Sequence, residues 1–211
     1  MEEQKGNLIV VSGFSGAGKG TLMKELIRQY DCYALSISAT TRNPREGEQD
    51  GREYFFKTVK EFENMIAGNQ LIEYARYVDN YYGTPKEYVE GQRQAGKDVI
   101  LEIEIQGALK IKKQYPEVLL IFVLAPSAKE LKSRLVGRGT ESEEVIEARL
   151  NRAVQESAYI EEYDYILIND NLEESVEKLH QVIQAQHNLT LNNKNLIENM
   201  RQELQGFVKG E

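Results

Sequence analysis

The chain has 211 residues, of which 41% are hydrophobic and 28% are charged, and this composition suits one compact α/β domain with a full core. Its formal net charge of -8 disfavours a nucleic-acid binder, because affinity for a phosphate backbone depends on clustered lysine and arginine. A nucleotide enzyme with a local basic pocket remains open. We expect a cytoplasmic protein without a membrane partner, because residues 1–5 are too polar for a signal peptide and no apolar run approaches a membrane span.

Four apolar segments predict the buried strands of a mostly parallel sheet. The first is residues 8–11, which precede a helical pattern over residues 19–30. The others are residues 99–105, 118–124 and 165–168, with helical patterns between them. The alternation of strand and helix predicts an α/β core in which helices flank a parallel sheet through right-handed crossovers.

Two segments of different character interrupt this core. Residues 37–94 mix aromatic-rich stretches with a short helical pattern at 59–67, which predicts a small α+β insertion. Residues 135–155 are dense in charge and predict a second, helical insertion, with Gly137 and Gly139 as hinges. The core then comprises residues 1–36, 95–134 and 156–211, and its end, from Asn188, is expected to be a peripheral helix or a frayed tail.

A glycine-rich run lies directly after the first strand and opens the first helix, which is the setting of a phosphate-binding loop, or P-loop. Backbone N–H groups of such a loop form an anion nest, and Lys19 is expected to reach the β- and γ-phosphates of a nucleotide. Because Gly20 follows the lysine, Thr21 is the candidate hydroxyl for Mg²⁺. The residues predicted to hold ATP phosphates are Gly13, Ser15, Gly16, Ala17, Gly18, Lys19, Gly20 and Thr21.

Two clusters in the first insertion suggest a site for a phosphorylated acceptor. Arg42 and Arg45 are three residues apart, with Pro44 between them, and could hold one phosphate with forked donors. A carboxylate at Glu73 could accept both the N1–H and the 2-amino group of guanine, a pair of donors that adenine lacks. The two arginines could instead belong to a solvated surface loop. Thr84, a candidate donor to the base, could also begin a helix through a capping box over residues 84–87.

Further arginines in the second insertion and directly before it are candidates for stabilising a migrating phosphoryl group. Arg134 and Arg138 are four residues apart on one predicted helix face, and Arg149 and Arg152 are three apart on the next. The alternative is that each pairs with nearby glutamates on a solvated helix. Asn169 follows the last predicted strand, where it could cap the helix that comes next.

Together these motifs resemble the guanylate kinases over about residues 7–185. The resemblance rests on the glycine-rich loop, on Ser-x-x-Thr-Arg-x-x-Arg at 38–45, on Tyr54, and on the segments 72–74, 80–84, 101–107 and 138–141. It implies a P-loop kinase core, a GMP-binding insertion at 37–94, a helical lid at 135–155, and transfer of the γ-phosphoryl of ATP to GMP with Mg²⁺.

The resemblance also implies roles for single residues. The GMP phosphate and guanine would be held by Ser38, Arg42, Arg45, Tyr54, Glu73, Tyr82, Thr84, Glu104 and Arg149. Lid closure would bring arginines onto the phosphates, Asn169 would lie near the adenine, and the reaction would rely on Lys19, Arg42, Arg138 and Arg149. Glu104 departs from the family, which usually has aspartate there, and Phe14 stands where the family often has a smaller residue.

Three other functions compete with this interpretation. The first is a P-loop kinase that phosphorylates another acceptor. It would differ from a guanylate kinase only at the residues that contact the base, and among these Glu73 argues for guanine. A scaffold domain that binds proteins would not need the intact Lys19. A switch GTPase should carry an Asn-Lys-x-Asp motif, which the sequence lacks.

Overall fold

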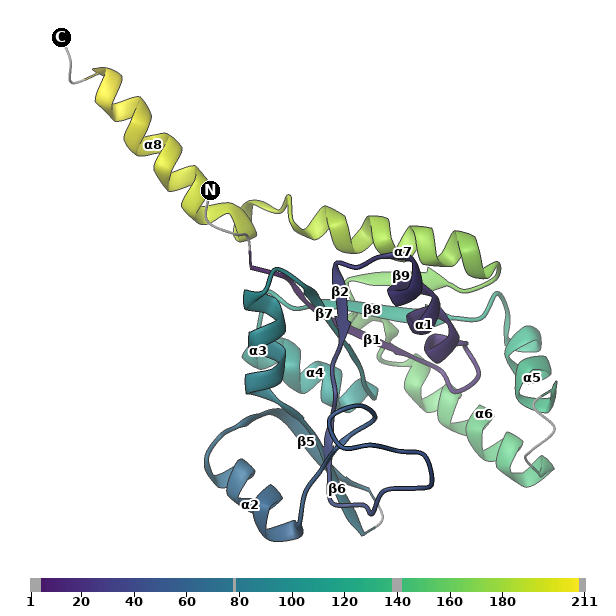
Figure 1. Ribbon diagram of the computed structural model, residues 1–211. Helices are drawn as coiled ribbons and strands as arrows, with labels where there is room; N and C mark the ends of the chain where they lie inside the picture. Colours follow the sequence, from purple (N-terminus) through teal and green to yellow (C-terminus); the bar gives the residue numbers. More distant parts are fainter. Residues whose placement is uncertain (1–4, 78, 138–141, 209–211) are drawn as a thin grey trace.

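The computed structural model describes residues 5–77, 79–137 and 142–208 (Figure 1). Its main layer is a five-stranded parallel sheet in the order β2-β7-β1-β8-β9, which confirms the predicted fold class. The strands are β1 (Leu8–Gly13), β2 (Tyr33–Leu35), β7 (Asp98–Glu102), β8 (Leu119–Leu124) and β9 (Tyr165–Ile168). With β1 in the middle, the loop that follows it lies at the centre of the sheet's carboxyl edge, where α/β proteins bind ligands.

Helices cover both faces of the central strands β1, β7 and β8, which explains why these strands are rich in apolar residues. The prediction of a buried strand at 165–168 is wrong in its burial, because the edge strand β9 is exposed except at Leu167. Ile9 and Val11 point to one face and pack with α1 (Lys19–Gln29) and α7 (Leu172–Gln186). Leu8 and Val10 point to the other, where they pack with α3 (Lys86–Gln94) and α4 (Ile105–Gln114). The two clusters form one core that holds the loop after β1 rigidly.

The predicted strand over residues 99–105 is wrong at its carboxyl end. Strand β7 stops at Glu102, Glu104 has extended backbone at the N-cap position, and α4 begins at Ile105. The alternation of apolar and acidic residues suggested a longer strand, but Ile105 is buried as the first residue of a helix instead. Both acidic side chains of this segment therefore lie at the end of the strand, beside the loop after β1.

Residues 39–85 build a second sheet, in the order β4-β3-β6-β5. Its strands are β3 (Ala39–Thr40), β4 (Phe55–Phe56), β5 (Leu71–Tyr77) and β6 (Asn80–Pro85). The predicted helix at 59–67 is confirmed as α2 (Val59–Ala67), and its Phe62 is buried with Ala39 and Leu71. A capping box between Thr58 and Glu61 begins this helix.

The remaining elements lie toward the carboxyl half of the chain. Helices α5 (Ala128–Gly137) and α6 (Glu143–Ser157) flank the carboxyl edge of the main sheet, and α6 is followed by the short 3₁₀ helix η1 (Ile160–Glu162). After η2 (Thr190–Asn193), helix α8 (Lys194–Val208) projects away from both sheets (Figure 1). Among the described residues, no helix is both long and apolar enough to cross a membrane.

Candidate active site

The glycine-rich loop turns sharply between β1 and α1, and two close contacts explain why glycine is needed. A Cβ at Gly13 would lie 2.3 Å from the carbonyl oxygen of Val123 on the neighbouring strand. Gly18, the N-cap of α1, has φ 88°, and a Cβ there would lie 2.5 Å from Nδ2 of Asn169. The loop is therefore pressed against β8 and against the residue after β9, and the N-terminus of α1 faces the cleft.

Lys19 folds back over this loop. Its Nζ donates to the carbonyl oxygen of Gly13 at 2.7 Å and to that of Phe14 at 3.3 Å. These bonds hold the ammonium group at the mouth of the nest, where phosphate oxygens would replace the two carbonyls. The neighbouring Gly20 and Thr21 are exposed in the first turn of α1.

Asn169 and Arg134 form a contact on the far side of the same loop. The buried Asn169 side chain donates from Nδ2 to the carbonyl oxygen of Ala17 at 2.8 Å, and Nη1 of Arg134 donates to the Asn169 carbonyl oxygen at 2.9 Å. The proposed helix-cap role of Asn169 is wrong, because Asn171 caps α7 by accepting from the N–H of Glu174. Arg134 also pairs with Glu130 at 2.9 Å, as the alternative of a glutamate partner on the helix expected, and its role toward ATP stays a prediction.

A cleft of about 740 Å³ opens between the P-loop, the end of β7 and helix α6. Arg149 of α6 donates from Nη1 to the hydroxyl of Ser15, which brings the second insertion onto the P-loop. Next to it, Arg152 pairs with Glu104 at 2.5 Å and with Glu156 at 2.8 Å. The cleft thus joins the P-loop to cationic groups that come from α6.

Glu102 was not singled out by the sequence analysis, yet it lines this cleft together with Lys19. Its side chain is exposed to the cleft, yet the protein around the carboxyl displaces part of the water there. This partial desolvation raises the pKa of the carboxyl. The positive charge of Lys19 opposes that rise. Its place at the last residue of a buried strand, next to the P-loop strand, is the signal that could have identified it.

A half-buried carboxylate and a buried hydroxyl meet in the second sheet. The Thr84 hydroxyl on β6 donates to Oε1 of Glu73 on β5 at 2.8 Å, and burial raises the pKa of the Glu73 carboxyl. The alternative capping role of Thr84 is wrong, because Pro85 is the N-cap of α3 and no side chain caps that helix. The antiparallel pairing of β5 with β6 brings the two side chains together.

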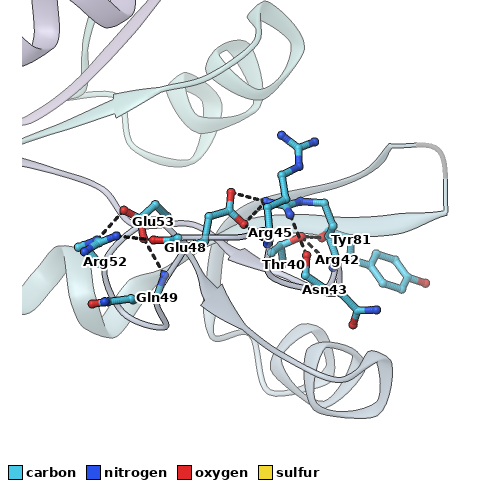
Figure 2. A network of polar contacts seen from close by, with 10 residues as sticks. Thr40, Arg42, Asn43, Arg45, Glu48, Gln49, Arg52, Glu53 and Tyr81 are labelled. Carbon is cyan, nitrogen blue, oxygen red and sulfur yellow. Dashed lines mark hydrogen bonds and ion pairs between the residues drawn. The ribbon is translucent and has the colours of Figure 1, made fainter.

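Arg42 lies in an aromatic setting on the loop after β3. Its guanidinium carbon is 5.3 Å from the centroid of the Tyr54 ring, and that ring lies edge-on to Tyr82 with centroids 6.2 Å apart. Glu48 accepts from Nη2 of Arg42 at 2.9 and 3.0 Å and from the backbone N–H of Arg45 at 2.8 Å (Figure 2). The structure thus gathers Arg42, Tyr54 and Tyr82, while Arg45 joins them through its backbone.

The predicted residues therefore form three groups rather than one continuous site. The P-loop and the arginines of α6 line the cleft, with Asn169 and Arg134 on the other side of the loop, whereas the Glu73 pair and the Arg42 cluster belong to the second sheet. Ser38 lies half-buried before β3, and its carbonyl oxygen accepts from the N–H of Phe55 at 2.9 Å. Arg138 lies outside the described residues.

Comparison with known proteins identifies the family to which this chain belongs. The guanylate kinase family model matches residues 5–186. A guanylate kinase of Desulfitobacterium hafniense is 53% identical and covers 88% of this chain and 93% of its own length; one of Bacillus cereus is 52% identical, with 89% and 92% covered. The crystal structure of guanylate kinase from Anaplasma phagocytophilum, 30% identical, superposes with a TM-score of 0.68 over 90% of each chain. The chain belongs to the guanylate kinase family.

Proposed function

We propose that this protein transfers the γ-phosphoryl of ATP to GMP and releases ADP and GDP. Beyond family membership, the observation that carries the proposal is the half-buried Glu73 carboxylate beside the Thr84 hydroxyl. Guanine offers adjacent donors at N1 and the 2-amino group, which the remaining lone pairs of the Glu73 carboxylate can accept, and an acceptor at O6, to which the Thr84 hydroxyl can donate only by turning its proton away from Glu73. Adenine lacks this pair of donors, so it would leave the acceptor positions of the half-buried carboxylate that face the base unpaired, which is costly.

In this proposal the P-loop binds the donor nucleotide. Backbone N–H groups of residues 13–21 surround the β- and γ-phosphates, and Lys19 leaves its two carbonyl partners to contact them. Asn169 and Arg134 lie behind the loop and border the adenine of ATP. These contacts bind and orient ATP but create no nucleophile.

The acceptor is bound by the second sheet and its loops. Arg42, Arg45, Tyr54 and Tyr82 bind the GMP phosphate, while Ser38, Glu73, Thr84 and Glu104 border the guanine. No strong general base is needed, because a phosphate monoester with a second pKa of about 6 is already ionised at neutral pH. An oxygen of GMP attacks the γ-phosphorus, the bond from that phosphorus to the β–γ bridging oxygen breaks, and ADP leaves with the electron pair.

Closure of the two insertions completes the site. We assign residues 1–36, 95–134 and 156–211 to the core, 37–94 to the GMP-binding insertion and 135–155 to the lid. Arg149, already in contact with Ser15, reaches the migrating phosphoryl group when the lid closes, and Arg138 joins it. Closure also excludes water, which would otherwise accept the phosphoryl group.

The residues beside the P-loop also suit Mg²⁺. This ion prefers oxygen ligands and keeps several waters, so one or two protein oxygens and the phosphates are enough. Thr21 is exposed in the first turn of α1, two residues after Lys19, and the Glu102 carboxylate opens onto the cleft that Lys19 also lines, so their oxygens fit such a role. When bound, Mg²⁺ supplies positive charge between the β- and γ-phosphates. A cytoplasmic location and the absence of a nucleic-acid partner stay predictions from the sequence.

The test is a coupled assay of ADP release with ATP and Mg²⁺ against GMP, AMP, CMP and UMP. The proposal predicts turnover with GMP at least about 100-fold above the other acceptors, with GDP as the product. Comparable turnover with AMP would overturn the assignment of Glu73. ADP release without any acceptor would indicate an ATPase.

A further inference from the structure

Glu48 is an acidic residue in the middle of an arginine-rich loop that otherwise suits an anion. Its carboxylate accepts Nη2 of Arg42 through both oxygens and the backbone N–H of Arg45 through one of them (Figure 2). The side chains of Arg42 and Glu48 expose only 16% and 18% of their surface. These contacts lower the pKa of the Glu48 carboxyl, first through the Arg42 hydrogen bonds, so that it stays ionised well below neutral pH.

The hydrogen bonds that Arg42 donates to Glu48 are among several contacts that fix the Arg42 guanidinium in place. Nη1 of Arg42 donates to the carbonyl oxygen of Asn43 at 2.7 Å, and its carbon lies 5.3 and 6.0 Å from the ring centroids of Tyr54 and Phe56. A free arginine side chain samples many rotamers and loses that freedom when it binds an anion. Here Glu48 holds the guanidinium over Tyr54 before a ligand arrives.

The contacts also leave donors for a phosphate. Glu48 takes Nη2 of Arg42 and the main chain of Arg45, so Nε of Arg42 and the guanidinium of Arg45 lie outside the Glu48 contacts. The main-chain bond closes the turn from Arg45 to Glu48, and the side-chain bonds of Arg42 tie that residue to the same carboxylate, so Glu48 links the two arginines. Glu48 thereby acts on the geometry of both residues from one side of the loop.

We propose that Glu48 is a positioning residue for the acceptor phosphate, which it serves by holding Arg42 and the Arg45 backbone in their binding geometry. This inference rests on the proposed function, because the phosphate in question is that of GMP. Glu48 is not placed in contact with the substrate. Its contribution comes from lowering the entropic cost of ordering Arg42 when GMP binds.

The same loop offers a matched control. Glu53 pairs with Arg52 at 2.6 Å and accepts the backbone N–H of Gln49 at 2.8 Å, so it has the same kinds of contact as Glu48. Its partner is Arg52 rather than Arg42, and both members are more exposed, at 56% and 34%. A general effect of removing an acidic residue from this loop should therefore appear in both variants.

The experiment compares Glu48→Gln with Glu53→Gln by the KM for GMP, the KM for ATP and the inhibition constant of guanosine, which lacks the phosphate. For Glu48→Gln we expect the KM for GMP to rise about tenfold, as for the loss of a charge-assisted hydrogen bond. The KM for ATP and the guanosine inhibition constant should change less than about twofold in both variants. Glu53→Gln should leave the KM for GMP within the same limit.

Three results would overturn the proposal. An unchanged KM for GMP would mean that Arg42 needs no support, and a lower one would mean that Glu48 competes with the phosphate. Equal weakening of GMP and guanosine would indicate general damage to the insertion. A Glu48→Asp variant, which keeps the charge but shortens the reach, should have an intermediate KM for GMP. If the wild-type chain failed to phosphorylate GMP, the proposed function itself would fall, independently of these comparisons.

Discussion

Replacing Glu73 by glutamine is the sharpest perturbation of the proposed acceptor site. Among the described residues, Thr84 is the one hydrogen-bond donor to the Glu73 carboxylate, and it uses Oε1. The remaining acceptor positions are available to the two adjacent donors of guanine. IMP keeps the N1–H and O6 of GMP but lacks the 2-amino group, so the ratio of kcat/KM for the two substrates isolates one hydrogen bond.

A hydrogen bond to a charged group contributes about 1.5–3 kcal/mol, which corresponds to roughly a 10- to 150-fold preference for GMP over IMP in the wild-type enzyme. Glutamine has one oxygen and presents an N–H₂ group to the guanine, so we expect the preference to fall below about fivefold. The assay is coupled ADP release with each substrate, and Glu63→Gln, an exposed position on α2, is the control. An unchanged preference in Glu73→Gln would refute the role given to this carboxylate.

Four further predictions test other parts of the account. Because burial raises the pKa of Glu73, the stability of the wild-type protein falls as pH rises through that pKa. Glutamine cannot ionise, so the Tm of Glu73→Gln relative to that of the wild type should rise from acidic to neutral pH. A Tm difference that does not change with pH would contradict this. Lys19→Met should reduce kcat at least about 100-fold without lowering Tm; near-normal turnover would remove the P-loop assignment. Gly13→Ala should cost about 2 kcal/mol or more by urea unfolding, because its Cβ would meet the Val123 carbonyl. Thr58→Ala should cost about 1 kcal/mol through the lost cap, with KM for GMP unchanged.

The sequence could predict those features that depend on neighbouring residues. Continuous apolar strands imply a sheet covered on both faces, and the glycine-rich run after the first strand implies a tight turn into a helix. The helix at 59–67 follows from its capping box and apolar spacing. Glu73 is a candidate from the sequence because a carboxylate suits the donors of guanine, and its role stays a prediction.

Contacts between distant segments could not be predicted in this way. The bond from Arg149 to Ser15 joins residues 134 positions apart, and its existence depends on how α6 packs. The local pattern around Thr84 also allowed a helix cap beside its predicted role at the base, but the pairing of β5 with β6 offers its hydroxyl the Glu73 carboxylate instead of a helix end. The end of β7 was misjudged for a similar reason, since alternating residues are compatible with both a strand and a helix start.

The central claim is that the phosphoryl group passes from ATP to GMP within this chain. The most direct measurement follows ATP labelled with ³²P at the γ-position, incubated with the enzyme, Mg²⁺ and GMP, with the products separated by chromatography. The account predicts that nearly all released label appears in GDP and that little appears as inorganic phosphate. Label found in phosphate with GMP present, or in no product at all, would contradict it.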